Sequence, residues 1–368
     1  MTNSRRLAAL LLLFIPAVAS AREYEVYLGG LAQPQLKWEQ QDPTVTETNP
    51  RNSGFALHRA RLIAAGSLRG YSILWEARIE AEMVPSFQLL DAWLSASGEL
   101  TARGHWRIMA GQQFAPFSRQ TILPAHTLQM NDYAQLVSLT PGRQLGLTAT
   151  LALPVVPSIQ VTAGLFNGKG TNIVENLDQN FMYVGRVAWR PIGERAPLME
   201  SALGPDAVWV AADVAYTKKK QGDFNEFDLL VGADAFFSWK GISAYVEYLW
   251  GNITYTAGAP KQNYHEQGFN AQAGYLLPIP GRLFRRFEVA FRFEAVAPNQ
   301  TVPITGPGDP TQARASYIAG INYFHREHNL KLQLNYSHNQ ELDEIDVAGR
   351  KASYDNDSVV LQLTWRLE

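Results

Sequence analysis

The sequence contains no cysteine, so disulfide bonds and thiolate metal sites are excluded and no covalent cross-link can hold the fold. An excess of positive charge is missing as well. The chain has 32 Lys and Arg against 34 Asp and Glu, and its formal net charge is −2. Without a basic domain or a long basic run, the composition argues against nucleic acid as a partner.

Enzyme motifs and long apolar runs are also lacking. We find no Gly-x-Ser-x-Gly elbow, no phosphate-binding P-loop and no His-Glu-x-x-His motif. His325 and His328 could form a metal pair, but no third ligand stands at a useful spacing. We therefore expect no enzyme activity, no resident metal and no cofactor. Beyond the N-terminal segment, no uncharged stretch approaches the ~20 residues that a membrane-spanning helix needs.

The N-terminal segment has the pattern of an export signal. Arg5 and Arg6 precede an apolar run at residues 7–18, and Ala19-Ser20-Ala21 supplies a small-residue cleavage site. The apolar run is too short to cross a membrane as a helix. We expect residues 1–21 to be a cleaved signal peptide and residues 22–368 to form one mature domain.

The mature chain is dominated by segments in which apolar and polar residues alternate. In residues 287–294 the odd positions read Phe, Val, Phe, Phe and the even positions Glu, Ala, Arg, Glu. Residues 71–82, 227–234 and 359–367 follow the same rule. Successive side chains of a strand point to opposite faces, so each segment has one apolar and one polar side. Many such segments behind an export signal predict a transmembrane antiparallel β-barrel.

The alternating segments number roughly sixteen, an even count of the kind found in bacterial barrels. We place them at residues 24–38, 55–68, 71–82, 89–97, 105–114, 144–152, 158–166, 183–191, 207–217, 226–239, 242–250, 268–277, 287–295, 316–324, 330–337 and 358–367. With the N-terminus on the periplasmic side, short inner turns should alternate with longer outer loops, and most links do. Two links depart from this rule: the outer link at 83–88 is short, and the inner turn at 192–206 is long.

Short motifs occur along nearly the whole mature chain. They include Phe55-x-x-x-Arg59-Ala60-Arg61-Leu62, Asp91-Ala92-Trp93, Gly111-Gln112-Gln113-Phe114, Gly164-Leu165-Phe166-Asn167-Gly168, Tyr245-Val246-Glu247-Tyr248, Gly268-Phe269-x-x-Gln272-Ala273-Gly274 and Gly320-Ile321-Asn322-Tyr323. In their order and spacing these motifs resemble the phosphate-selective porin O/P family of Gram-negative outer membranes.

The resemblance implies a homotrimer in the outer membrane, each copy a barrel of about sixteen strands with a long third loop folded into the lumen. By that analogy residues 115–143 would form the constriction, beginning with Pro116, Phe117, Ser118 and Arg119. Apolar residues of this loop also favour packing against the wall: Phe117, Ile122, Leu123, Leu128 and Leu136. The chain departs from the family at its last residue, which is Glu368 rather than an aromatic residue.

The polar faces of the strands would line the lumen, so their charges would set its selectivity. The basic candidates are Arg59, Arg61, Arg78, Arg107, Arg186, Arg190, Arg292 and Lys331. The acidic candidates are Glu76, Glu80, Glu82, Asp91, Asp213, Asp228, Asp234, Glu247, Glu288 and Glu294. We expect the arginines at 59, 61, 78, 107 and 186 to form one positive stripe that favours anions, across the lumen from the acids of the later strands. The alternative is that these charges pair and stiffen the wall.

A lysine run stands in the predicted fifth outer loop, at Lys218, Lys219 and Lys220. In the family that the chain resembles, lysines of that loop help to bind phosphate, so these three residues are candidates for an anion-binding loop. A lysine run in a loop is equally what a solvated surface patch contains.

The leading interpretation is an outer-membrane porin that lets small hydrophilic solutes diffuse passively, with a preference for anions or phosphate. A barrel of roughly sixteen strands encloses an aqueous channel, whereas about eight strands would be filled by side chains. Three alternatives stay open: a structural or adhesive barrel with a plugged lumen, a barrel enzyme, and a soluble exported β-protein. The partners would be outer-membrane lipid, small solutes or anions, and further copies of the same chain.

Overall fold

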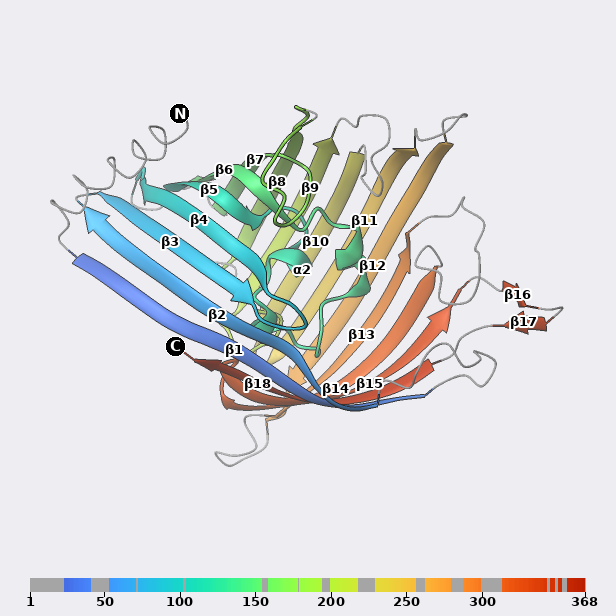
Figure 1. Cartoon of the computed structure of the whole chain (residues 1–368). Helices are drawn as coiled ribbons and strands as arrows, with labels where there is room; N and C mark the ends of the chain where they lie inside the picture. The colour runs from blue at the N-terminus through green and yellow to red at the C-terminus, as the bar shows by residue number, and fades with distance from the viewer. Residues whose placement is uncertain are drawn as a thin grey trace.

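The chain folds into a closed antiparallel β-barrel (Figure 1). The computed structural model describes residues 23–40, 53–70, 72–101, 104–153, 158–177, 179–193, 199–217, 229–255, 262–278, 287–298, 313–342, 345–347, 350–352 and 356–367. The expected signal peptide at residues 1–21, the acidic candidate Asp228 and the lysine run at 218–220 lie outside the described residues. No helix among the described residues is long and apolar enough to cross a membrane.

Sixteen strands make up the barrel, as the alternating pattern predicts. They are β1 (Glu23–Glu39), β2 (Gly54–Gly70), β3 (Ile73–Glu82), β4 (Gln88–Glu99), β5 (His105–Phe114), β6 (Arg143–Leu153), β7 (Ser158–Phe166), β8 (Met182–Ile192), β9 (Ala207–Thr217), β10 (Leu229–Trp239), β11 (Ile242–Tyr255), β12 (Gln262–Leu276), β13 (Phe287–Ala297), β14 (Arg314–Arg326), β15 (Leu330–Glu341) and β18 (Asn356–Leu367). Each strand pairs with its neighbours in chain order, and β1 pairs with β18 to close the ring. We call the end where β1 begins and β18 ends the inner end.

Two short strands stand outside the barrel and were not predicted. β16 (Ile345–Val347) and β17 (Arg350–Ala352) pair as a hairpin between β15 and β18. Three-residue strands are too short to show a period of two, so the sequence contains no signal for them. The long inner turn, by contrast, is where the sequence places it, between the end of β8 and the start of β9.

The predicted alternation describes how side chains are distributed across the wall. On β13 Phe291 is 50% exposed on the outer face, while its neighbour Arg292 is 1% exposed on the inner face. Leu361 and Leu363 of β18 are likewise exposed, whereas Gln362 and Thr364, which alternate with them, are buried. The outer face is therefore apolar, as a surface in contact with lipid must be. One large apolar side chain lies on the opposite side of the wall, since Trp209 of β9 is buried on the inner face.

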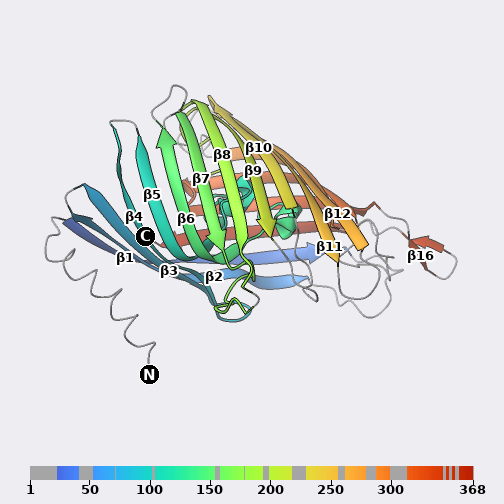
Figure 2. The same cartoon turned by 90° about the horizontal axis from the view of Figure 1, so that it is seen from above.

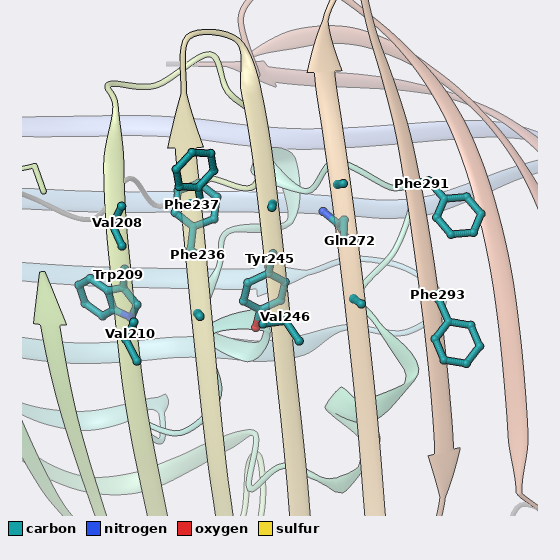
Figure 3. Close-up of a pocket in the computed structure, with 14 residues that line it drawn as sticks. Val208, Trp209, Val210, Phe236, Phe237, Tyr245, Val246, Gln272, Phe291 and Phe293 are labelled. Carbon is teal, nitrogen blue, oxygen red and sulfur yellow. The ribbon is translucent and has the colours of Figure 1, made fainter. Parts of the chain in front are cut away.

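Part of the outer surface is hollowed over strands β9 to β13 (Figure 3). The hollow has a volume of about 470 Å³ and an almost entirely apolar lining. Phe237, Val246, Phe291 and Phe293 contribute bulky side chains. Ala273, which pairs in register with Phe291, is one of several alanines in the lining. The depression arises because small and large residues are mixed on one face of the sheet.

The chain between β5 and β6, residues 115–142, packs inside the ring of strands (Figures 1 and 2). We call it the lumen segment. It contains a short helix, α2 (Arg119–Ile122), and two 3-10 turns, η1 (Ala125–Thr127) and η2 (Gln135–Leu139). Its apolar side chains join inward-facing ones of the wall in one buried cluster: Ala115, Phe117, Ala134, Leu136, Leu139, Phe166, Met182, Val184, Ala215, Leu230, Leu249 and Val296.

Because one face of the wall is apolar and the other polar, a charge introduced on the two faces should change the unfolding free energy differently. Replacing Phe291 by Arg puts a guanidinium on the lipid-facing side of mid-β13, and we expect a loss of about 2–4 kcal/mol in unfolding free energy. Ser67→Arg is the matched control, because Ser67 faces inward and pairs in register with Glu76. Urea unfolding in lipid vesicles measures both variants. Equal losses would mean that Phe291 does not contact lipid.

Candidate functional site

The lumen segment is held by hydrogen bonds to inward-facing side chains of the wall. Gln129 is the centre of this network, because its side chain and its carbonyl oxygen bond to five consecutive strands at distances of 2.8–3.1 Å. The partners on β11 to β15 are Ser243, Gln272, Glu288, Asn322 and Gln333. Near Gln129, the carbonyl oxygen of Leu128 accepts a hydrogen bond from Lys331. The backbone N–H of Asn131 donates to the side-chain oxygen of Asn335 at 3.1 Å.

Two glycines of β12 make room for this close packing. A Cβ atom at Gly268 would lie 2.7 Å from Cβ of Leu136, and one at Gly274 would lie 1.8 Å from Nε2 of Gln129. A larger residue at Gly268 would displace Leu136, and one at Gly274 would force the Gln129 side chain away from its partners. Both glycines belong to the family-like motif in β12, so that motif marks the place where the segment docks.

A cluster of charged and aromatic groups anchors the start of the lumen segment on β8 to β11. Arg119 stacks on Phe236, with 4.5 Å between the guanidinium carbon and the ring centroid. Arg119, Arg186 and Arg190 all lie within 6 Å of the Trp209 ring, and each such contact is favourable when water is excluded. Arg186 also bonds Asp213 at 2.6 Å and Asp234 at 2.7 Å, so carboxylates from the next two strands balance its charge.

On the opposite side, the lumen segment is tied to β2 through Asp132. Arg59 and His58 both contact its carboxylate, and Arg59 also donates to Gln33 of β1 at 2.9 Å. Partial desolvation would raise the pKa of the Asp132 carboxyl, whose side chain is 55% exposed, but the hydrogen bond from His58 and the charge of Arg59 hold this pKa well below its ordinary value. The carboxylate therefore stays charged and keeps the segment bridged across the lumen.

The wall formed by β2 to β6 carries a ladder of ion pairs. The shortest distances are 2.8 Å for Arg61 to Glu82, 2.5 Å for Arg78 to Glu80, 3.1 Å for Arg107 to Glu76, and 2.8 Å for Arg143 to Asp91. This corrects the expectation of an uncompensated positive stripe with its acids across the lumen. The acids lie beside the arginines. Glu82 faces Arg61 in register on the adjacent strand, and Glu80 lies two residues from Arg78 on β3. The long side chains of Arg107 and Arg143 reach acids two strands away.

Exposure separates the charged groups of this wall. The side chains of Arg78 and Arg107 are 27% and 35% exposed, whereas those of Glu80 and Asp91 are 6% and 11% exposed. Glu76 is the exception at 34%. The two arginines thus extend further into the lumen than most of their partners.

The predicted basic residues fall into two groups. Arg59, Arg61, Arg78 and Arg107 lie on the ion-pair wall, whereas Arg186, Arg190, Arg292 and Lys331 are buried on the wall that the lumen segment covers. The acids Glu247, Glu288 and Glu294 are also buried on that covered wall. Phe117 and Ser118 are fully buried, and Arg119 is 1% exposed.

Several residues that hold this arrangement were not predicted from the sequence. They are Gln129, Asp132, Arg143, Glu200 and Trp209, none of which the sequence pattern singles out as a site residue. The pair of histidines suggested as metal ligands does not act together: His328 is buried against Ser201, with 2.8 Å between Nε2 and Oγ, and His325 is exposed. The described residues contain no group of three His, Asp or Glu side chains placed to hold a metal ion.

His126 of the lumen segment makes the structure sensitive to acid. Burial, with the positive charges of Arg366 and Lys331, lowers the pKa of His126 to about 2, and the neutral ring accepts a hydrogen bond from Arg366. The unfolded chain binds this proton near pH ~6.5, well before the folded chain does. We expect stability to fall with decreasing pH from about 6.5, by up to ~1.4 kcal/mol per pH unit for one such group.

The variant His126→Gln tests this, because the amide oxygen still accepts from Arg366 but cannot titrate. The unfolding free energy in vesicles should be lower at pH 5 than at pH 7 for the natural protein. This drop should be smaller for the variant, because one fewer proton is taken up on unfolding. An unchanged pH dependence would show that His126 is protonated in the folded state.

Comparison with known proteins places the chain in a family. The model for the phosphate-selective porins O and P matches residues 31–367. An anion-selective porin from Comamonas acidovorans has a similar structure, with a TM-score of 0.61 and 13% identity over 94% of this chain and 100% of that one. OmpT, an outer membrane protein of Vibrio cholerae solved in its trimer form, has a TM-score of 0.57 and 11% identity over 93% of this chain and 99% of that one.

The outer-membrane channel DcaP of Acinetobacter baumannii gives a TM-score of 0.57 and 10% identity over 93% of this chain and 97% of that one. Because these sequence identities are low, the similarity to solved structures supports the fold alone. No curated protein matches the sequence. Since the family model spans nearly all of the barrel, this chain belongs to the phosphate-selective porin O and P family and is an outer-membrane channel for small solutes.

Proposed function

We propose that the channel is a passive pore with a mild preference for anions, narrowed between the lumen segment and the ion-pair wall of β2 to β6. The observation that carries this proposal is that the wall exposes two arginines, Arg78 and Arg107, but only one of their partner acids, Glu76. A solute passing there meets the guanidinium groups of Arg78 and Arg107 before it meets the deeper carboxylates of Glu80 and Asp91. Guanidinium groups present forked donors that suit oxyanions.

The partial exposure of Arg78, Arg107 and Glu76 also supports an open pore over a plugged lumen. These side chains face the interior, yet roughly a third of each is accessible to water. The lumen segment covers the inner faces of β11 to β15, where Glu288, Arg292 and Lys331 are at most 1% exposed. The route for solutes therefore runs along the ion-pair wall.

A general anion preference fits this wall better than a specific phosphate site. A tight oxyanion site needs several donors that are not already satisfied. Here the guanidinium groups of Arg61, Arg78 and Arg107 are each bonded to a carboxylate. The field at the wall is thus weakly positive, which favours passage of anions without strong binding. The lysines at 218–220 stay candidates for an additional anion-binding loop.

We further propose that the chain is exported with cleavage after Ala21, that the inner end of the barrel faces the periplasm, and that three copies assemble in the outer membrane. The leader pattern supports the first point. The alternation of short turns at the inner end with longer links at the other end supports the second. The solved trimer form of the Vibrio cholerae porin supports the third.

Selectivity is tested at the exposed arginines. In the double variant Arg78→Gln and Arg107→Gln we expect the zero-current potential in a KCl gradient to shift towards cation preference, because the exposed carboxylates of Glu76 and Asp132 then lose two compensating charges. Lys37→Gln is the control, since Lys37 faces inward beside Glu39, 3.1 Å away, on β1. A natural channel that is cation-selective, or a double variant with unchanged potential, would refute the proposed charge filter.

The constriction is tested by shortening the lumen segment. Deleting residues 119–139 removes α2, η1 and η2 and should raise the single-channel conductance, because the covered wall would then be open to water. Replacing the external hairpin at residues 345–352 by a short glycine-serine linker is the control for loop removal in general. An unchanged conductance in a folded, heat-modifiable barrel would show that the segment does not limit ion flow.

A further inference from the structure

Some described residues of the long inner turn between β8 and β9 are buried inside the barrel. Its residues Glu200 and Ser201 are 1% and 0% exposed, and Ala202 is buried as well. A carboxylate is rarely buried unless it is paired, so the position of Glu200 calls for a specific role. We call residues 199–202 the inner-turn segment.

The inner-turn segment contacts the lumen segment at three separated points. Arg119 donates to the carbonyl oxygen of Met199 at 3.0 Å. The backbone N–H of Glu200 donates to the carbonyl oxygen of Thr127 at 3.4 Å, and the backbone N–H of Gln129 donates to Oε2 of Glu200 at 2.6 Å. Two consecutive residues of the turn therefore hold both α2 and the chain after η1.

The inner-turn segment is itself fixed to the wall. Nη2 of Arg292 on β13 lies 3.6 Å from the Glu200 carboxylate, and Ser201 bonds His328 in the turn between β14 and β15. The inner-turn segment thus connects the turn between β14 and β15 to the side of the lumen segment that faces the inner end of the barrel. Glu200 is the key residue, since one carboxylate oxygen accepts from the Gln129 backbone and also faces Arg292.

The lumen segment needs such a bridge for a physical reason. Apart from one helical turn and two 3-10 turns it has no regular structure of its own, so it depends on outside partners to keep one conformation. Gln129 is bound from the wall side by β11 to β15 and from the inner end by Glu200. A hydrogen bond to a charged acceptor is among the stronger ones available inside a protein.

We propose that the inner-turn segment is a latch that sets the position of the lumen segment from the inner end, with Glu200 as its positioning residue. This inference rests on the proposed role of the lumen segment as the constriction. In this proposal two segments together set the width of the pore. They enter the barrel from opposite ends and meet at Gln129. Loosening the latch should widen the pore and make it fluctuate, without changing a residue that faces the solute route.

Single-channel recording of Glu200 variants tests the latch. We expect Glu200→Ala to show higher conductance and more open-channel noise than the natural channel. Glu200→Gln should lie between the two, because its amide oxygen still accepts from the Gln129 N–H while its charge is lost. The control is Glu327→Gln, which removes an exposed acid from the turn between β14 and β15 at the same mouth. If all three variants match the natural channel, or if Glu327→Gln has the same effect as Glu200→Ala, the latch is refuted.

A labelling experiment gives a second readout that does not depend on conductance. The chain has no cysteine, so Ser201→Cys creates a single thiol at a fully buried position. We expect this thiol to resist a water-soluble maleimide, and to react faster by at least about tenfold when Glu200→Ala is added, the factor that loss of one charge-assisted hydrogen bond produces. Glu327→Cys provides the rate of an exposed thiol. A Ser201→Cys thiol that reacts at this rate by itself would refute the buried latch.

The deletion of residues 119–139 separates the two proposals. If the deletion raises conductance but Glu200→Ala does not, the constriction stands and the latch fails. If the deletion leaves conductance unchanged, the constriction itself fails, whatever the labelling rates are.

Discussion

The structure depends on the requirement that backbone N–H and C=O groups within a membrane find partners inside the protein. Pairing of β1 with β18, from Gly30 and Leu367 to Glu39 and Ser358, leaves no edge strand in the ring. Closure also divides every strand into a lipid face and a lumen face. Because no second sheet covers the lumen face, its polar groups must be satisfied by water, by each other, or by a segment folded inward.

The protein uses all three solutions, and each occupies a different part of the wall. Side chains of β2 to β6 satisfy one another as ion pairs and stay partly wet, as Arg107 and Glu76 show. The inner faces of β7 to β15 are covered by the lumen segment, which brings apolar residues such as Phe117 and Leu136 into contact with the wall. The channel is therefore asymmetric in cross-section, with a charged wet side and a packed dry side.

Much of the barrel could be predicted from the sequence because alternation is a local signal imposed by two different solvents. The expected strands at 105–114, 158–166 and 207–217 agree with β5, β7 and β9 at both ends. The lumen site was predicted less well. Arg186 is a clear inward-facing residue from its strand pattern, but its partners Asp213 and Asp234 depend on how three strands align, and alternation does not encode that alignment.

By itself, the sequence determined the class of the protein: an outer-membrane barrel with an apolar outer belt, a charged lumen and a long apolar link after Phe114. Each of these properties follows from the order of residues along one strand or link, where neighbours in sequence decide the outcome. Only the tertiary structure decided which charges pair, which wall is covered, and that Glu200 meets Gln129 inside the barrel. Those contacts join residues far apart in the chain, and their geometry is set by closure of the ring and by packing within it.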